Sequence, residues 1–552
     1  MSDSWQDVQA LAAHMKAQRA AREAEWLELS RWICPYRGVF AGEDLAPSGS
    51  RRNRRALIQP VTRALLRGAS GMTSGMTPRN ISWFEPDFDD PELGELSGAR
   101  VWLDEVDRRM KAVLSAGGFY QAIQSFNTDL LWAGCALIYA EHSETSFMRF
   151  ECAQVGSWWI APDGEGRLEA VLRCMVWTPA RLAQVFGRDR LDEGTRAKIE
   201  KEPYAAIRIW HLVRRRLPGE GGRAGLPWIS YFWEDSSQDF LSVGGYNEMP
   251  YFFTVWHEGQ TLYGTGPGDE ALPDARQLNE LERMKLRGLA TLARPPVKHP
   301  ASMPRPDLAP GGMTAVENMS DIIAPILDLA PFSHCLPALQ AEIQTVDQRL
   351  EQSLMAAIFA SIPLDQRPKD MSATEFLERK REALQQLGPV ISAYEPNVLS
   401  PLLERLCACL DRGGLLPPPP PALEGLPLPM RMEFISPMAN ALRQTGAETT
   451  RALVADVLNM ARASPDVLDK LDLDQAVDEL ATGLGAPGKL VRTDADVAAM
   501  RQQRAQMRQE AQAAQNQAMQ SQNALTEAQA LGQMAGAAKD IGELEQAGAG
   551  TV

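Results

Sequence analysis

The chain has few of the residues that a disulfide-bonded or secreted protein needs. Only 7 cysteines occur among 552 residues. Their odd number and scattered positions favour reduced thiols in a cytosolic compartment over a disulfide framework. No run reaches the roughly 18 apolar residues that cross a bilayer, and the charged, amphipathic residues 1–26 do not resemble a signal peptide. The sequence predicts a protein that is made and assembled in the cytoplasm.

Motifs for catalysis or ligand binding are also missing. The 6 histidines stand singly without an HExxH pair, and there is no Walker A motif. Cys407 and Cys409 lie in an apolar helical pattern with no histidine nearby, which favours packed thiols over a metal site. Residues 264–268, GTGPG, lack the GxGxxG spacing and indicate a tight bend into a helix. We expect no metal, no cofactor and no enzymatic activity.

Positive charge is scarce, with 56 Lys and Arg against 71 Asp and Glu and a net charge of −15. This argues against nucleic-acid binding over the whole surface, because phosphate neutralisation needs a cationic face. It leaves room for a local basic strip, or for a pore through which DNA slides. The acidic pair Asp89 and Asp90 is interpreted as solvated surface. One dense basic cluster is interpreted as solvated surface or an intersubunit salt-bridge patch rather than a DNA contact: Arg51, Arg52, Arg54 and Arg55.

Apolar periodicity predicts four helices in the N-terminal part of the chain, at residues 5–33, 60–75, 104–114 and 119–132. The first should end near Cys34, because a residue before proline is pushed out of the α region. These helices precede a change in composition.

Eight of the 13 tryptophans lie between Trp132 and Trp256. Short β-leaning runs separated by turn signals occupy this stretch. The runs are residues 136–141, 147–155, 168–177, 206–213 and 251–256. Thr178 and Pro179 should start a short helix as N-cap and first residue. The fold class predicted is α+β with a tryptophan-rich core, in a mainly helical multidomain chain.

Two long helices follow, at about 278–292 and 336–360, and a proline-rich unit separates them. The prolines of residues 294–313 exclude a helix or a central strand. The two helices are therefore expected to be an outgoing and a returning leg joined by a compact unit.

A polar loop, residues 362–371, ends the returning leg. Arg367 and Lys369 share it with two aspartates, so its formal charge is zero. The helix after the loop opens with a capping box, Ser372 and Glu375, in which each side chain satisfies a free backbone donor. A well-capped helix would hold the loop in a fixed place, although an ordinary helix hairpin explains the pattern equally.

After a helix at 394–412 come an extended proline-rich linker, a strand at 430–435 and small helices at 439–484. Residues 489–531 contain no Gly or Pro and are rich in Gln and Ala. Thirty-five helical residues there would span roughly 50 Å. A heptad-like seam of mostly small residues, interrupted at Arg504 and Ser521, predicts packing against several neighbouring copies. Its members are Val497, Met500, Met507, Ala511, Ala514, Ala518, Leu525 and Ala528.

The order of these elements resembles that of the portal, or head-to-tail connector, proteins of short-tailed, T7-like bacteriophages. The likeness extends over nearly the whole chain. It is carried by four stretches in the right order, residues 51–86, 101–123, 262–283 and 371–390.

The resemblance implies a ring of about twelve subunits around an axial channel. Each subunit would divide into the following parts: wing, 1–262; outgoing stem helix, 263–294; clip, 295–335; returning stem helix, 336–361; tunnel loop, 362–371; tunnel helix and return to the wing, 372–436; crown, 437–488; helical barrel and tail, 489–552. Arg367 and Lys369 would face the DNA.

The function implied is mechanical. Such a ring passes double-stranded DNA during packaging, retains it and releases it, and has the terminase, the tail adaptor and the capsid and scaffolding proteins as partners. It resides at one vertex of the virion, without a membrane. The alternative is a non-viral scaffolding protein with a coiled-coil tail. That alternative accounts for the tail but not for a two-legged stem with a compact unit at its far end.

Overall fold

The protein is described from a computed structural model in which most of the chain is placed. The described residues are 5–40, 57, 59–94, 96, 98–164, 166–216, 225–259, 261–293, 297–298, 324–325, 330–361, 387–388, 390–424, 430–435, 453–457, 459–460, 470–483 and 494–547. The chain divides into two compact units, residues 1–442 and 443–552. Each is considered by itself.

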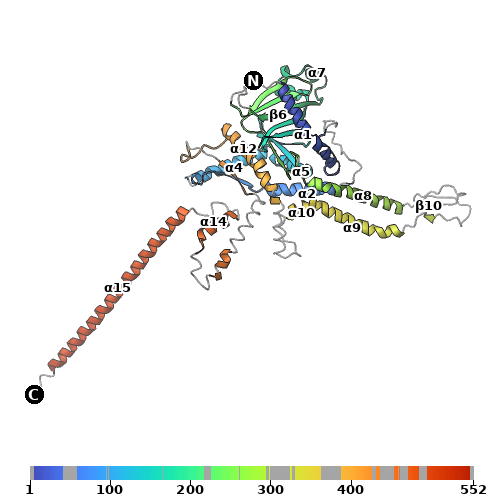
Figure 1. Cartoon of the computed structure of the whole chain (residues 1–552). Helices are drawn as coiled ribbons and strands as arrows, with labels where there is room; N and C mark the ends of the chain where they lie inside the picture. The colour runs from blue at the N-terminus through green and yellow to red at the C-terminus, as the bar shows by residue number, and fades with distance from the viewer. Residues whose placement is uncertain are drawn as a thin grey trace. The chain divides into compact units, whose positions relative to one another are not determined.

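Helices dominate the start of the first unit, as the apolar periodicity predicted (Figure 1). They are α1 (Trp5–Trp32), α2 (Gln59–Met76), α3 (Pro91–Gly94), α4 (Ala99–Ala116) and α5 (Phe119–Ala133). The helix predicted at 104–114 starts five residues earlier than expected, because Gly98 rather than a side-chain cap begins it. Gly118 and Gly134, both with positive φ, bound α5 in the left-handed conformation that glycine adopts most readily.

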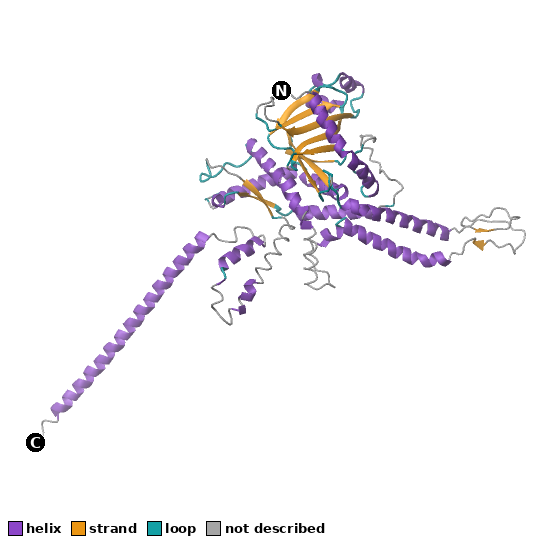
Figure 2. Cartoon of the chain, viewed as in Figure 1, coloured by secondary structure: helices purple, strands orange, loops and turns teal. Residues whose placement is uncertain are grey.

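Two antiparallel sheets form the tryptophan-rich region (Figure 2). A three-stranded sheet has the order β3-β2-β9, and a five-stranded sheet has the order β4-β5-β6-β7-β8. Their strands are β2 (Cys135–Ser143), β3 (Phe147–Ala153), β4 (Trp158–Pro162), β5 (Leu168–Trp177), β6 (Ile207–Arg215), β7 (Trp228–Glu234), β8 (Phe240–Tyr246) and β9 (Tyr251–Val255). All five predicted β runs are strands here, so the α+β interpretation is confirmed.

Short helices cover the far part of the larger sheet. Thr178 caps α6 (Pro179–Phe186) as predicted, accepting a hydrogen bond from Arg181 N at 3.3 Å. A 3₁₀ turn, η1 (Arg188–Arg190), and α7 (Glu193–Lys201) follow. Leu182 and Ile209 belong to the small apolar cluster beneath them.

The main core joins α2, α4 and α5 to the smaller sheet and to α12 (Ser400–Arg412). Its largest fully buried side chains include Trp26, Trp83, Trp132 and Trp158. A second cluster lies between the first half of α1 and the five-stranded sheet. The single helix α1 therefore contributes to both clusters.

The predicted legs are α8 (Pro267–Ala293) and α9 (Ala330–Ser353), which contact each other along their lengths (Figure 1). The helix predicted at 278–292 begins eleven residues earlier than expected. Pro273 is the seventh residue of α8, beyond the first turn, so the helix continues without the hydrogen bond that an N–H there would donate to Asp269 O. Beyond the legs, β10 (Val297–Lys298) pairs antiparallel with β11 (Ala324–Pro325).

The returning leg is not the single helix predicted at 336–360. It breaks after α9 and resumes as α10 (Ala356–Ser361). Met355 at the break has φ +59°, a left-handed conformation that interrupts a right-handed helix.

The predicted strand at 430–435 is confirmed as β12 (Met430–Phe434), which pairs with β1 (Phe84–Phe88) far back in the sequence. The helix predicted at 394–412 is present, but residues Glu395–Leu399 form a π-helical turn, η2, before α12.

The second unit is helical in its described residues. It contains α14 (Leu473–Gly483) and α15 (Asp494–Ala547). With 54 residues, α15 has a length of about 80 Å and exceeds the predicted helix, because it continues through Gly532 and Gly536. A bidentate ion pair joins the two helices, with Arg501 Nη1 and Nη2 at 2.6 and 2.8 Å from the carboxylate oxygens of Asp474.

No helix among the described residues is long and apolar enough to cross a membrane. The seven cysteines are free thiols. Burial raises the pKa of Cys407 to about 11, so this thiol stays protonated at neutral pH and is chemically inert.

Candidate functional site

The basic residues favoured from the sequence are not part of the described structure. Arg367 and Lys369 lie outside the described residues, and so does the arginine cluster Arg51, Arg52, Arg54 and Arg55. These assignments stay predictions. The site that the structure does define is the two-helix stem, meaning α8 and α9, together with the contacts that hold its base on the first unit.

Asp269, in the first turn of α8, is the centre of the stem base. Arg22 of α1 donates to both of its carboxylate oxygens, at 2.9 and 2.6 Å, and Gly266 N donates to Oδ2 at 2.8 Å. A carboxylate in the first turn also suits the positive end of the helix dipole. Arg22 and Trp26 further donate to the Ala133 carbonyl at 3.2 and 2.9 Å. One helix, α1, thus ties the start of α8 to the end of α5.

Backbone segments meet closely at the same place. A Cβ on Gly134 would lie 2.6 Å from the Thr265 carbonyl carbon, and one on Gly268 would lie 2.2 Å from Trp132 O. Only glycine permits this approach. The GTGPG run predicted as a tight bend therefore has a second role, which is to bring the stem base against α5. Arg276 of α8 also pairs with Glu28 of α1, about two helix turns further along both helices.

A buried ion pair between Arg37 and Asp129 holds α5, the helix against which the stem base packs. Arg37 Nε and Nη2 donate to the two oxygens of Asp129, both at 2.7 Å. Asp129 has no exposed surface, and Arg37 is 24% exposed. Trp132 Nε1 and Cys152 Sγ also donate to this carboxylate, at 2.8 and 3.4 Å. Four hydrogen bonds to one buried carboxylate make a rigid support, because each satisfies an oxygen lone pair that burial removes from water.

The two legs are held together by apolar and polar contacts. Leu278 of α8 and Val346 and Leu350 of α9 are fully buried between them. Arg349 lies 3.4 Å from Asp274 and donates to Gln277 Oε1 at 3.2 Å. Farther out, Met284, Leu286 and Leu289 of α8 expose 57%, 50% and 40% of their surface. The base of the stem is thus covered within one chain, whereas its outer part carries exposed apolar side chains.

The break in the returning leg rests on α2. A Cβ on Gly68 would lie only 2.4 Å from Leu354 O, so glycine lets the broken backbone approach α2. Arg67 of α2 pairs with Glu351 of α9 at 2.9 Å on the surface. The chain thus turns at a defined point, seven residues before the predicted tunnel loop begins.

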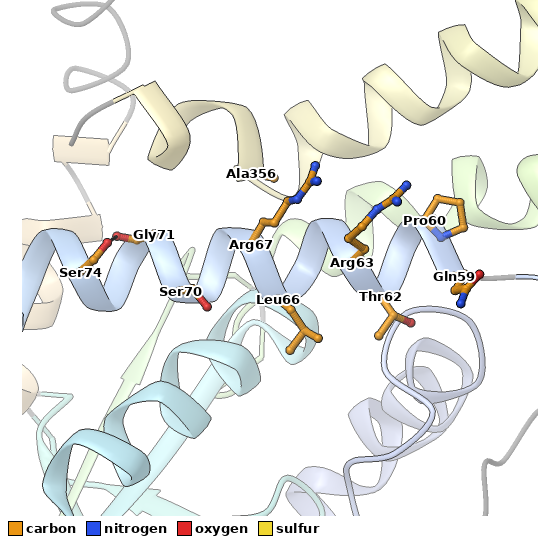
Figure 3. Close-up of a pocket in the computed structure, with 10 residues that line it drawn as sticks. All are labelled: Gln59, Pro60, Thr62, Arg63, Leu66, Arg67, Ser70, Gly71, Ser74 and Ala356. Carbon is orange, nitrogen blue, oxygen red and sulfur yellow. Dashed lines mark hydrogen bonds between the residues drawn. The ribbon is translucent and has the colours of Figure 1, made fainter. Parts of the chain in front are cut away.

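A shallow cavity of about 1020 Å³ runs along the outer face of α2 (Figure 3). Arg63 and Arg67 leave the helix on one side of it, and Thr62 and Leu66 on the other. Its ten lining residues, called the α2 groove below, are Gln59, Pro60, Thr62, Arg63, Leu66, Arg67, Ser70, Gly71, Ser74 and Ala356. The sequence predicted this segment as a helix, and its apolar periodicity does not indicate the groove.

The predicted seam lies on α15, where the described side chains have little cover from their own chain. Met507 and Leu525 expose 56% and 62% of their surface. Met500 is half-buried and Ala511 is exposed, while the side chains of Ala514 and Ala518 lie outside the described set. The seam between subunits stays a prediction.

One buried cluster has the residue types of a catalytic site but not its arrangement. His211 Nδ1 lies 2.7 Å from Tyr251 Oη and its Nε2 lies 3.0 Å from Ser230 Oγ. Burial, aided by the charge of Arg173, holds the pKa of His211 well below its usual value. The cluster is sealed between the two sheets without access for a substrate. Among the described residues, no group of His, Cys, Asp or Glu is arranged to hold a metal ion.

Comparison with known proteins gives consistent matches along the chain. The sequence profile of a family described as "Bacteriophage head to tail connecting protein" matches residues 6–491. A protein named "Probable portal protein" from Bordetella phage BPP-1 is 29% identical over 506 residues, covering 89% of each chain. A "Portal protein" from Salmonella phage epsilon15 is 27% identical over 506 residues, covering 90% of each.

These matches agree with the order of elements and with the structural role expected for the chain. They include both legs of the stem and the anchors at its base. The chain belongs to the family of bacteriophage head-to-tail connecting proteins.

Proposed function

We propose that this protein is a bacteriophage portal subunit, located at one vertex of the capsid and structural rather than enzymatic. The family match and the two relatives named as portal proteins support this function. The single observation that carries it is the anchored two-helix stem. A stem fixed at its base by Arg22 and Asp269, and carrying a small paired unit between its legs, suits a part that docks other proteins at a distance from the body.

The assembly proposed is a ring of about twelve copies around a channel. Residues 1–262 would be the wing, 263–294 and 336–361 the stem, and 295–335 the clip. Residues 437–488 would be the crown, and 489–552 the helical barrel. The exposed Met284, Leu286 and Leu289 of α8 support neighbouring stems lying against one another, because apolar side chains of this size gain free energy when covered.

Double-stranded DNA would pass through the ring during packaging and ejection. The net charge of −15 suits a conduit, because a strongly cationic bore would trap DNA by releasing its counterions. Residues 362–371 would be the tunnel loop, and Arg367 and Lys369 would make intermittent phosphate contacts. Replacing both with alanine should reduce the DNA packaged or retained per particle. Packaging equal to that of the wild type would remove this assignment.

The partners proposed follow from the position in the particle. The clip would bind the terminase large subunit during packaging and the tail adaptor afterwards. The outer edge of the ring would contact the major capsid and scaffolding proteins. The long α15 would line up with its copies in a barrel, where small residues such as Ala511 allow close approach of neighbouring helices.

Negative-stain microscopy of the purified protein tests the proposal. We expect rings of about a dozen subunits with a central hole, together with a matching particle mass in sedimentation. Monomers or rods over the concentration range tested would contradict the portal function and favour the alternative of a scaffolding protein with a coiled-coil tail.

A further inference from the structure

Within the part of the chain that the structure describes, the α2 groove is an uncovered surface with a distinct chemical character. The opposite face of α2 is buried, including Val61, Leu65 and Met72, so the helix is firmly seated and its outer face is fixed in place. Leu66 in the groove is 50% exposed, and most of the lining surface is apolar. Among the described residues of the lining, Arg63 and Arg67 are the charged ones and none is acidic.

A complementary surface follows immediately in the sequence. Residues 45–84 contain seven arginines and no acidic residue, whereas residues 85–98 contain six acidic residues and no basic one. In the structure, Asp89, Asp90 and Glu92 lie exposed after β1. Two exposed apolar side chains, Leu96 at 36% and Val101 at 71%, follow them. These five residues are called the acidic edge.

The elements that carry the groove and the edge pack against different parts of the chain. The groove lies on α2, which packs on α5, α9 and α10, while the edge follows β1, which packs on β12 and α4. Among the described residues, no ion pair joins Arg63 or Arg67 to the acidic edge: Arg67 pairs with Glu351, and Asp87 of β1 pairs with Arg431. Within the described residues, neither surface covers the other, and Arg63 has no ion-pair partner in the acidic edge.

From this complementarity we infer that the α2 groove of one subunit receives the acidic edge of the next. A ring built by rotation requires two different surfaces that fit each other head to tail. Here one surface offers half-exposed Leu66 on one side of α2 and two arginines on the other, and the second surface offers exposed Leu96 and Val101 in the same segment as three carboxylates. An apolar centre with a charged surround is the common arrangement of a protein interface. Opposite charges would also set which surfaces meet.

DNA is the competing partner for a basic groove. A DNA backbone would use Arg63 and Arg67 but would gain nothing from Leu66 or from the mostly apolar lining. The observations therefore favour a second copy of this chain, and the inference rests on the proposed ring.

The test uses the symmetry of a head-to-tail contact. Arg63→Glu makes the groove acidic, and Glu92→Lys makes the edge less acidic; Arg67 is left unchanged because it pairs with Glu351. Each full-length variant alone would place more like charges against each other, and we expect the fraction in rings to fall about tenfold. Mixing the two variants offers both better matched contacts, so rings should return with equal numbers of each variant by native mass spectrometry.

Matched controls place the same charge changes on α7, as Lys201→Glu and Glu200→Lys, both of which should assemble as the wild type does. The inference is overturned if either variant alone forms rings normally or if mixing fails to restore them. It is also overturned if rings form normally but package less DNA, a result that would assign the groove to DNA. If the wild-type protein forms no rings, the proposed portal function is contradicted, and so is this inference, which depends on it.

Discussion

The two units of this chain are stabilised in different ways. Residues 1–442 bury a continuous core around Trp26, Trp83 and Trp132, with polar groups such as Asp129 satisfied inside it. In the described part of residues 443–552, Ala476 is the buried apolar residue. Others, such as Leu471 and Met500, are half-buried. Nine large apolar side chains there are exposed: Leu453, Met460, Leu473, Val477, Met507, Met519, Leu525, Leu531 and Met534. The first unit therefore has the means to fold within one chain, while the second needs other surfaces to cover it.

Two ion pairs with the same geometry, one in each unit, should differ most in how much they contribute to the free energy of unfolding. Arg37–Asp129 and Arg501–Asp474 are both bidentate, at 2.7 and 2.7 Å and at 2.6 and 2.8 Å. Asp129→Ala should lower the free energy of unfolding of the first unit by about 3 kcal/mol, because it leaves a largely buried guanidinium unpaired. Denaturant unfolding followed by tryptophan fluorescence measures this.

Asp474→Ala is the matched control in the second unit. Asp474 and Arg501 are 51% and 62% exposed, and water replaces the partner of an exposed charge at little cost. We expect no measurable change in stability. Equal losses from the two substitutions would show that the units do not differ as described.

A second pair of substitutions compares backbone packing in the two units. Gly68→Ala places a methyl group 2.4 Å from Leu354 O, and should destabilise the first unit by about 1–3 kcal/mol as the returning leg shifts. Gly532→Ala in α15 meets nothing within 4 Å, and should stabilise that helix by about 0.5–1 kcal/mol through higher helix propensity. Thermal unfolding by circular dichroism gives both signs. Two changes of the same sign would contradict the assignment of Gly68 as a point of close packing.

Sequence patterns predicted the parts of this molecule that depend on nearby residues. Apolar periodicity placed α1 and α2, and short β-leaning runs separated by turn signals placed the strands. The break at Met355 was missed, because a left-handed residue there depends on packing against Gly68, nearly three hundred residues earlier in the chain. The early start of α8 was missed because Pro273 obscures a helical pattern.

In the site too, features set by neighbouring residues were predicted, and contacts between residues far apart in the sequence were not. The GTGPG bend was predicted, but not its fit against α5, nor the pairing of Arg22 with Asp269, which are 247 residues apart. No local pattern relates two such residues. The α2 groove was likewise hidden, since a helix whose outer face is covered by another subunit reads in sequence as an ordinary amphipathic helix with a few exposed apolar residues.

A last expected effect concerns how stability depends on pH, and it distinguishes the two units because of where the histidines lie. All six histidines lie within residues 1–442. Buried His211 is neutral in the folded state because its pKa is held well below the usual value, chiefly by burial. In the unfolded chain it binds a proton near pH 6.5. The unfolded state thus binds more protons below that pH, and the first unit should lose about 1.4 kcal/mol for each pH unit below it.

His211→Gln tests this, because glutamine keeps a donor and an acceptor for Tyr251 and Ser230 but does not titrate. The variant should be less stable at pH 7 and should show a shallower decline between pH 6.5 and 5.5, measured by denaturant unfolding at each pH. His14→Gln, on the exposed face of α1, removes a histidine without touching the buried cluster and serves as the control. An unchanged pH dependence in His211→Gln would mean that protons enter the first unit elsewhere. The first unit would then lose stability in acid for a reason other than its buried histidine.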